Sequence, residues 1–190
     1  MGRVYSELDD GLREFIAEQR VFFVASAPLS ASGHVNFSPK GLDSLRVLGP
    51  RDVAYLDLTG SGIETVAHVQ ENGRLTLMFC AFQGRPRIVR LQGRGRVVEP
   101  ADANWEQLSS NFPAYKSRRS IVLLHIERIA DSCGYGVPLF EYVGERNQLL
   151  AWAERKGDTG IAEYQVEKNR QSIDGLPGLK QIAEPTHPSE

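Results

Sequence analysis

The segment 87–99 constrains the fold most, because its residues alternate with a period of two. From Val89 to Val97 the odd positions are apolar or small, whereas the even positions are Arg90, Gln92, Arg94 and Arg96. This pattern predicts a long strand with one face in a core and a cationic opposite face. Gly93 and Gly95 lie on the apolar side, and glycines inside a strand mark a bulge, a barrel bend or close approach by a backbone or ligand.

A turn and a helix precede this strand. Val53–Leu58 and Arg74–Cys80 read as strands, and the turn 59–62 between them leads into a helical pattern. Ser61 and Glu64 match an S-x-x-E capping box, so the helix is expected to begin at Ser61. The free N–H groups of its first turn could bind a phosphate. An ordinary helix cap is the alternative, because Ser61 satisfies one donor and Glu64 adds negative charge there.

Arginines gather along the strand 87–99 and just before it. Guanidinium groups suit phosphate and carboxylate better than ammonium groups do, so these side chains could bind a local anion. A solvated outer face balanced by carboxylates is the alternative for each of them. The basic turn 117–120 has the same two interpretations. These arginines are Arg85 just before the strand and Arg87, Arg90, Arg94 and Arg96 within it.

The remaining patterns predict more strands than helices. Ser6 and Asp9 match a second capping box, which opens an amphipathic helix. A hairpin of strands is expected at 20–26 and 34–38, with further strands at 45–48 and 120–129 and a helix at 100–111. Six or seven strands with few helices between them indicate a mainly β (α+β) fold, an antiparallel barrel with peripheral helices.

The C-terminal third is less regular. A loop at 132–138 carries Tyr135 at its centre, one helix is expected at 145–156, and another begins after Gly157. From Ile173 onward, Gly, Pro and Glu predict an extended arm with a disordered end, which could wrap a partner subunit. The expected organisation is a barrel domain at 1–131, a loop and helical extension at 132–172, and the arm at 173–190.

Composition excludes several classes of function. The 190 residues carry 22 basic and 24 acidic side chains, which argues against a general nucleic-acid surface. No apolar run reaches the roughly 20 residues of a membrane helix, and a signal peptide is not recognisable, so a cytoplasmic protein is expected. Two cysteines give no disulfide framework, four histidines have no metal-ligand spacing, and the nucleotide motifs Gly-x-Gly-x-x-Gly and Walker A are absent.

Three motifs together resemble those of the FMN-binding split barrels related to pyridoxamine 5′-phosphate oxidase. They are Asn36–Gly41, Thr59–Thr65 and Arg87–Gly93, each next to an expected strand. The resemblance covers roughly residues 5–130, and the later Ser-Cys-Gly-Tyr segment is similar to that of an uncharacterised branch of the superfamily. It implies a six-stranded antiparallel split barrel that forms a homodimer, with FMN between the subunits.

The resemblance also implies roles for individual residues. Lys40 corresponds to the lysine that approaches the pyrimidine edge of the flavin, where a cation would stabilise charge on the reduced ring. Asn36 and Ser38 alternate toward the same side. Arg87 and Arg90 match the arginines of the family's strand, and Arg87 could bind the phosphate. The implied cofactor-binding residues are Asn36, Ser38, Lys40, Thr59, Gly60, Ser61, Gly62, Thr65, Arg87, Arg90 and Tyr135.

The implied function is an FMN-dependent oxidoreductase that acts on a small molecule, with NAD(P)H or another reductant as electron donor. Gly62 and Ile63 replace the arginine-lysine pair often found in the family. This departure favours the alternative, a non-catalytic binding protein or flavin carrier that uses the same cleft or has lost the cofactor. A deazaflavin- or haem-binding protein is a third possibility, because related split barrels can host these groups. True pyridoxamine 5′-phosphate oxidase activity is not expected, because the segment from Cys133 to Pro138 does not match the oxidase's substrate contacts.

Overall fold

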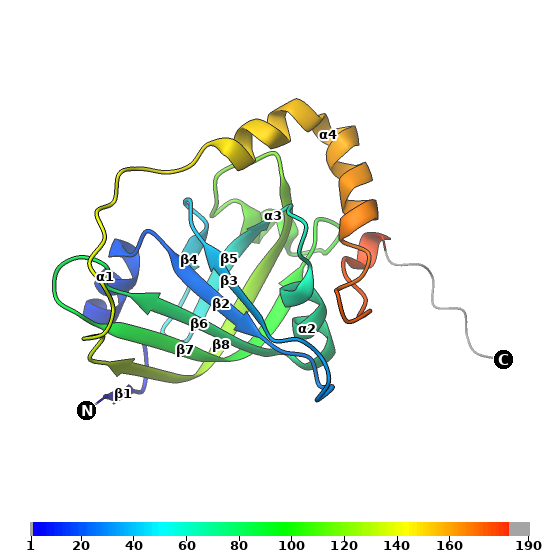
Figure 1. Ribbon diagram of the computed structural model, residues 1–190. Helices are drawn as coiled ribbons and strands as arrows, with labels where there is room; N and C mark the ends of the chain where they lie inside the picture. The colour runs from blue at the N-terminus through cyan, green and yellow to red at the C-terminus, as the bar shows by residue number, and fades with distance from the viewer. Residues whose placement is uncertain (1, 183–190) are drawn as a thin grey trace.

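A computed structural model describes residues 2–182 of the chain (Figure 1). Strands outnumber helices, as the sequence predicts, and each strand pairs with its neighbours in the antiparallel sense. The strands are β1 Val4–Tyr5, β2 Phe22–Ser26, β3 Asn36–Lys40, β4 Leu45–Val47, β5 Asp52–Leu58, β6 Arg74–Cys80, β7 Ile88–Val98 and β8 Arg118–Ser132. The helices are α1 Asp10–Glu18, α2 Glu64–Asn72, α3 Trp105–Ser109, α4 Gln148–Lys168 and the 3-10 helix η1 Lys180–Ile182.

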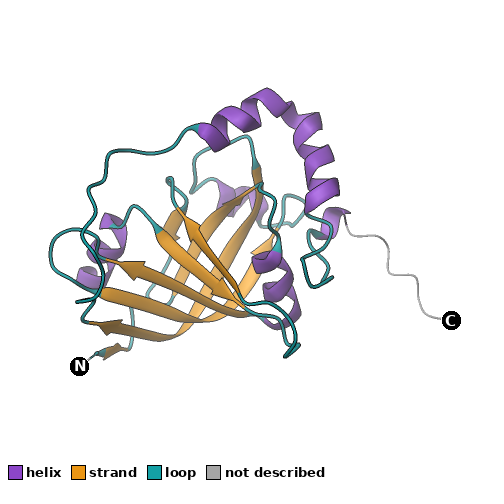
Figure 2. Cartoon of the chain, in the orientation of Figure 1, coloured by secondary structure: helices purple, strands orange, loops and turns teal. Residues whose placement is uncertain are grey.

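The strands form one sheet that curls into a split barrel (Figure 2). Their order is β3-β2-β6-β7-β8-β5-β4, and β1 pairs with the end of β8. The predicted hairpin is confirmed as β2 and β3, with Phe22 opposite Lys40 and Ser26 opposite Asn36. The predicted fold class is confirmed: the described chain has eight strands, of which seven match expected strands and only the short β1 was not predicted.

The alternation in β7 has the predicted consequence. Val89 and Leu91 are fully buried in the main core. At Gly93 the register with β8 shifts, and a Cβ atom there would lie 2.0 Å from the carbonyl oxygen of His125. Gly95 instead faces the side chains of Val69 and Leu75 at 3.0–3.1 Å. Both the bulge and the close backbone approach predicted for these glycines are therefore present.

Both predicted capping boxes are wrong. Asp9 is itself the N-cap of α1, and its carboxylate accepts a hydrogen bond from the backbone N–H of Leu12 at 2.8 Å. Helix α2 begins at Glu64, after an N-cap at Ile63 that makes no side-chain capping bond. The carboxylate of Glu64 accepts from the backbone N–H of Ile173 at 3.4 Å, so a distant loop attracts the side chain that the capping box requires.

The C-terminal region partly differs from the prediction. Two helices separated at Gly157 are confirmed as the halves of α4, which bends there at φ 65° and arches over one end of the sheet in Figure 1. The helix expected at 100–111 is limited to α3. Residues 173–182 do not form an extended arm, because they turn back and bury Leu179 completely. The rest of the predicted arm, 183–190, lies outside the described residues.

Candidate functional site

A cavity of about 920 Å³ opens between the ends of β3 and β5 and the segment that leads into α4. Its size lies within the range of roughly 300–1,000 Å³ that is typical of small-molecule and cofactor sites. Polar groups from β3, β8 and the turn after β5 form one part of the wall: Ser38, Lys40, Arg119, Thr59, Gly60 and Gly62. Apolar and aromatic side chains form another part: Leu42, Leu56, Leu58, Tyr142 and Leu149.

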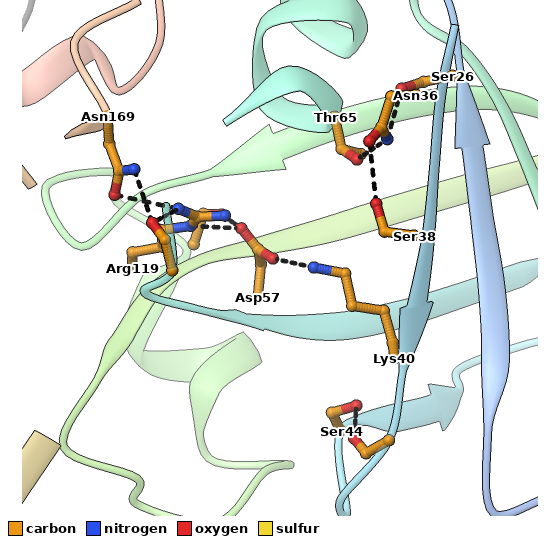
Figure 3. A network of polar contacts seen from close by, with 12 residues as sticks. Ser26, Asn36, Ser38, Lys40, Ser44, Asp57, Thr65, Arg119 and Asn169 are labelled. Carbon is orange, nitrogen blue, oxygen red and sulfur yellow. Dashed lines mark hydrogen bonds and ion pairs between the residues drawn. The ribbon is translucent and has the colours of Figure 1, made fainter. Parts of the chain in front are cut away.

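A buried carboxylate holds two cations at this wall (Figure 3). Asp57 is only 1% exposed, and its two oxygens lie 2.9 Å from Lys40 Nζ and 2.7 Å from Arg119 Nε. Burial alone would raise the pKa of Asp57, but the Arg119 guanidinium and the Lys40 ammonium outweigh it and hold that pKa well below its usual range. Asp57 is therefore an anion at neutral pH that orients both cations.

A bulge explains why Arg119 is buried. The register between β5 and β8 shifts between Asp57 and Leu58, so Arg119 is the extra residue of β8 and turns toward the carboxylate. Arg119 Nη1 also donates to the carbonyl oxygen of Gly60 at 3.1 Å and to the side chain of Asn169 at 3.0 Å. Its Nη2 has no hydrogen-bond partner within residues 2–182, which leaves guanidinium N–H groups free for a ligand.

The turn after β5 is fastened by the end of α4. Asn169 Nδ2 donates to the Gly60 carbonyl oxygen at 2.9 Å, and Gln165 Nε2 donates to Thr59 Oγ1 at 2.8 Å. A Cβ atom added at Gly60 would have no neighbour within 4 Å, so the turn is open on its cavity side. The turn is thus held by α4 and its C-cap on one side and is accessible to a ligand on the cavity side.

A second polar network runs from the cavity into the protein. Ser38 Oγ donates to Asn36 Oδ1 at 3.0 Å, and Asn36 Nδ2 donates to Thr65 Oγ1 at 2.8 Å and to Ser26 Oγ at 3.3 Å (Figure 3). Ser26 Oγ lies 3.0 Å from Nδ1 of the fully buried His68. Burial lowers the pKa of His68, so the imidazole is neutral at physiological pH.

Most of the predicted site residues meet at this cavity or at the network beside it. Those on β3, on the turn after β5 and on α2 do so: Asn36, Ser38, Lys40, Thr59, Gly60, Gly62 and Thr65. Ser61 is exposed and does not line the cavity. Arg87 and Tyr135 line a different cavity, of about 800 Å³, and Arg90 donates to Ser132 Oγ at 3.1 Å.

Arg87 is already engaged in that second cavity. Its guanidinium donates to Asp131 at 3.1 Å and to the hydroxyl of Tyr5 at 2.8 Å. Within one chain, Arg87 and Lys40 therefore line different cavities. Another arginine of the predicted cationic strand, Arg94, pairs with Glu127 on the surface. This pair agrees with the alternative interpretation of a solvated face balanced by carboxylates.

Sequence reasoning missed several residues of the cavity. Gln165 and Asn169 come from the helical extension, more than a hundred residues after the turn that they hold. The basic turn 117–120, which contains Arg119, was a candidate phosphate contact, but the sequence pattern did not show which of its arginines would be buried. Within residues 2–182 there is no group of three acidic, histidine or cysteine side chains placed to hold a metal ion, and no helix is long and apolar enough to cross a membrane.

These features define a class of protein, an antiparallel split barrel with an open glycine turn and a buried ion-pair cluster beside a large cavity. The family model described as pyridoxamine 5′-phosphate oxidase matches residues 8–133. The pyridoxamine 5′-phosphate oxidase family protein ustO of Aspergillus flavus is 41% identical over 192 residues, which cover 92% of this chain and 77% of that protein. The chain therefore belongs to the pyridoxamine 5′-phosphate oxidase family.

Solved structures support the fold. A variant of HupZ from Group A Streptococcus superposes with a TM-score of 0.53 at 20% identity, covering 66% of this chain and 99% of that one. A provisionally assigned pyridoxamine 5′-phosphate oxidase of Lactobacillus delbrueckii superposes with a TM-score of 0.50 at 20% identity, covering 66% of this chain and 94% of that one. At this level of identity the likeness concerns the fold alone.

Proposed function

We propose that the protein is a homodimeric FMN-dependent oxidoreductase whose flavin occupies the cavity beside Lys40 and Arg119. One observation carries the proposal. The Nη2 group of Arg119, which is free within the described residues, and the open turn at Gly60 line the same cavity, next to a wall of leucines. An anionic tail and a flat, largely apolar ring fit these two parts of one cavity. The residues present therefore fit the cofactor.

Each residue has a distinct task in this proposal. Arg119 and the backbone of the turn 59–62 would hold the phosphate, and Asn169 keeps the Gly60 carbonyl oxygen turned away from it. Lys40 uses one of its three N–H donors on Asp57, so the others can meet the polar edge of the ring. Bound flavin supplies hydride or electron transfer, and a fixed ammonium group at its edge favours the reduced, more negative ring.

Exposed apolar side chains support the dimer. Val35 and Phe37 project from the edge strand β3 and its approach, and Val143 is 96% exposed in the segment before α4. Leu139 and Phe140 in the same segment are also exposed. Large exposed apolar groups on an edge strand and in an irregular segment are surfaces that a second chain could cover. The substrate is proposed to be a small molecule, and the electron donor NAD(P)H or another reductant.

A second candidate is a flavin- or deazaflavin-binding protein without turnover. Gly62 and Ile63 supply no cation, and the carboxylate of Glu64 lies close to the place where a Cβ at Gly62 would stand, at 2.7 Å. Negative charge beside the phosphate end weakens anion binding. A haem-binding protein is the third possibility carried by the resemblance.

An absorption spectrum of desalted protein, followed by titration with FMN, tests the proposal. Near one flavin per chain is expected, and anaerobic NAD(P)H or dithionite should bleach it. Lys40→Met should weaken FMN binding by about tenfold, because it removes a charged donor. Gly60→Leu should reduce binding by at least about tenfold, because the new side chain occupies the cavity.

Gly136→Leu is the matched control for the steric change, because a Cβ there also meets nothing within 4 Å but Gly136 does not line the cavity. A spectrum with a Soret band and no flavin would favour haem. Failure of the wild type to bind any flavin, or unchanged affinity in both cavity variants, would overturn the assignment of the site.

A further inference from the structure

The polar network behind β3 contains a buried group that the proposed function does not use. His68 is fully buried on α2, and its Nε2 has no hydrogen-bond partner within the described chain. Its Nδ1 lies 3.0 Å from Ser26 Oγ, at the inner end of the network. Among residues 2–182 the ring can therefore act on the network only through Nδ1.

The directions of the hydrogen bonds can be worked out from the outer end. Asn36 presents its carbonyl oxygen to Ser38 and its NH₂ group to Ser26 and Thr65. Ser26 therefore accepts from Asn36, and the only partner for its own proton within residues 2–182 is His68 Nδ1. An imidazole nitrogen that accepts must be unprotonated, so the proton of the neutral ring is on Nε2.

These hydrogen-bond directions also determine whether the cavity wall can donate to a ligand or accept from it. The Ser38 hydroxyl donates its hydrogen bond to Asn36 Oδ1, and Ser38 lines the cavity. Its oxygen can then only accept a hydrogen bond from a ligand. Two residues further along β3, Lys40 can only donate. The strand thus presents an acceptor beside a donor.

We infer that His68 is a positioning residue that, through Ser26 and Asn36, makes Ser38 an acceptor for the N–H group of a cyclic imide in the ligand. This inference rests on the proposed function, in which the ligand is FMN. The polar edge of a flavin carries an N3–H donor between two carbonyl oxygens, which complements Ser38 and Lys40. A deazaflavin has the same edge, whereas haem carries no such donor at its rim.

The direction of the network can be tested without a ligand. Nitrogen-15 chemical shifts of labelled protein should show His68 as the neutral tautomer protonated at Nε2. A ring protonated at Nδ1 would donate to Ser26 Oγ instead of accepting from it, which would remove His68 as the acceptor of the Ser26 proton and overturn the inference. Because this measurement needs no flavin, it separates failure of the inference from failure of the proposed function.

The second test compares the binding of FMN with that of 3-methyl-FMN, which lacks the N3–H donor. The wild type should prefer FMN by about tenfold, since the analogue leaves the Ser38 acceptor unpaired. His68→Leu and Ser26→Ala should abolish most of that preference. His68→Asn should retain it, because the asparagine Oδ1 stands where His68 Nδ1 stood and can accept the same proton.

Ser109→Ala is the matched control, because Ser109 is as buried as Ser26, each at 5% exposure, but lies on α3. If the buried variants do not fold, Ser38→Ala decides, since it removes the acceptor from a partly exposed position of an edge strand. Equal binding of both flavins by the wild type, or an unchanged preference in Ser38→Ala, would overturn the inference. A wild type that binds neither flavin overturns the proposed function and this assignment with it.

Discussion

Asp57 organises the candidate site at the scale of single residues. It brings an arginine from β8 and a lysine from β3 within 3 Å of one buried carboxylate. Buried ion pairs add little net stability, because desolvation offsets their attraction, but removing one member leaves the others unpaired. For the stability of the fold, the presence of both charge signs among Asp57, Arg119 and Lys40 therefore matters more than any single bond between them.

Asp57→Asn should lower the free energy of unfolding at pH 7 by about 3 kcal/mol, because it leaves Arg119 buried without an anion. The neighbouring cations depress the pKa of folded Asp57, so its contribution is present above the unfolded value of roughly 3.9 and is lost as the pH falls below it. Urea unfolding at pH 7 and at pH 3 should therefore show a steeper loss for the wild type than for the variant.

Asp43→Asn is the control for this prediction. Asp43 pairs with Arg46 at the surface, and exposed pairs contribute at most about 1 kcal/mol. Equal effects of the two substitutions would contradict the importance assigned to burial.

The sequence predicted some of the site residues and not others, for physical reasons. Lys40 and Gly60 follow strands in recognisable motifs, so local pattern was sufficient for them. The burial of Arg119 depends on a bulge between two strands some sixty residues apart, which no local pattern encodes. Arg87 matched a motif, but its pairing with Tyr5 and Asp131 arises only when β1 joins the sheet.

At the scale of elements, β7 shows how much an alternating pattern can predict. Its apolar positions face the core, and its two glycines allow close packing on that side. Helix starts were predicted less well. The capping residues of α2 were misassigned because Glu64 is drawn toward the loop at Ile173, a tertiary contact that overrides the local motif.

Gly93→Ala should be much more destabilising than Gly95→Ala. At Gly93 the new methyl group would meet backbone atoms of β8 at 2.0–2.8 Å, whereas at Gly95 it would meet side chains at 3.0–3.1 Å that can shift. The expected losses are at least about 3 kcal/mol and about 1 kcal/mol respectively. Thermal unfolding of the two variants checks this, and similar melting temperatures would contradict the bulge geometry.

At the scale of the whole molecule, the predicted antiparallel split barrel is confirmed, because many strands with few helices between them leave few other arrangements. The path of the C-terminal extension was not predictable. Its attachment depends on single bonds such as those of Asn169, and on the burial of Leu179, rather than on a strongly amphipathic pattern.

The proposed dimer should depend on the exposed apolar segment before α4. Val143→Glu places a charge on a side chain that is almost fully exposed in the single chain. Light scattering should show twice the chain mass for the wild type and the single-chain mass for the variant. Ala151→Glu, on the exposed side of α4, adds the same charge and should stay dimeric. A wild type that is monomeric with flavin bound would contradict the dimer.

The bond from Asn169 to Gly60 lies across the boundary of the matched family region, which ends at residue 133. The part of the barrel shared with distant relatives and the helical extension therefore form one thermodynamic unit at this turn. Any ligand that stabilises the turn also stabilises the end of α4, and by reciprocity a change in α4 alters the affinity of the turn. A substitution in the extension can thus alter the turn after β5 without replacing any residue of that turn.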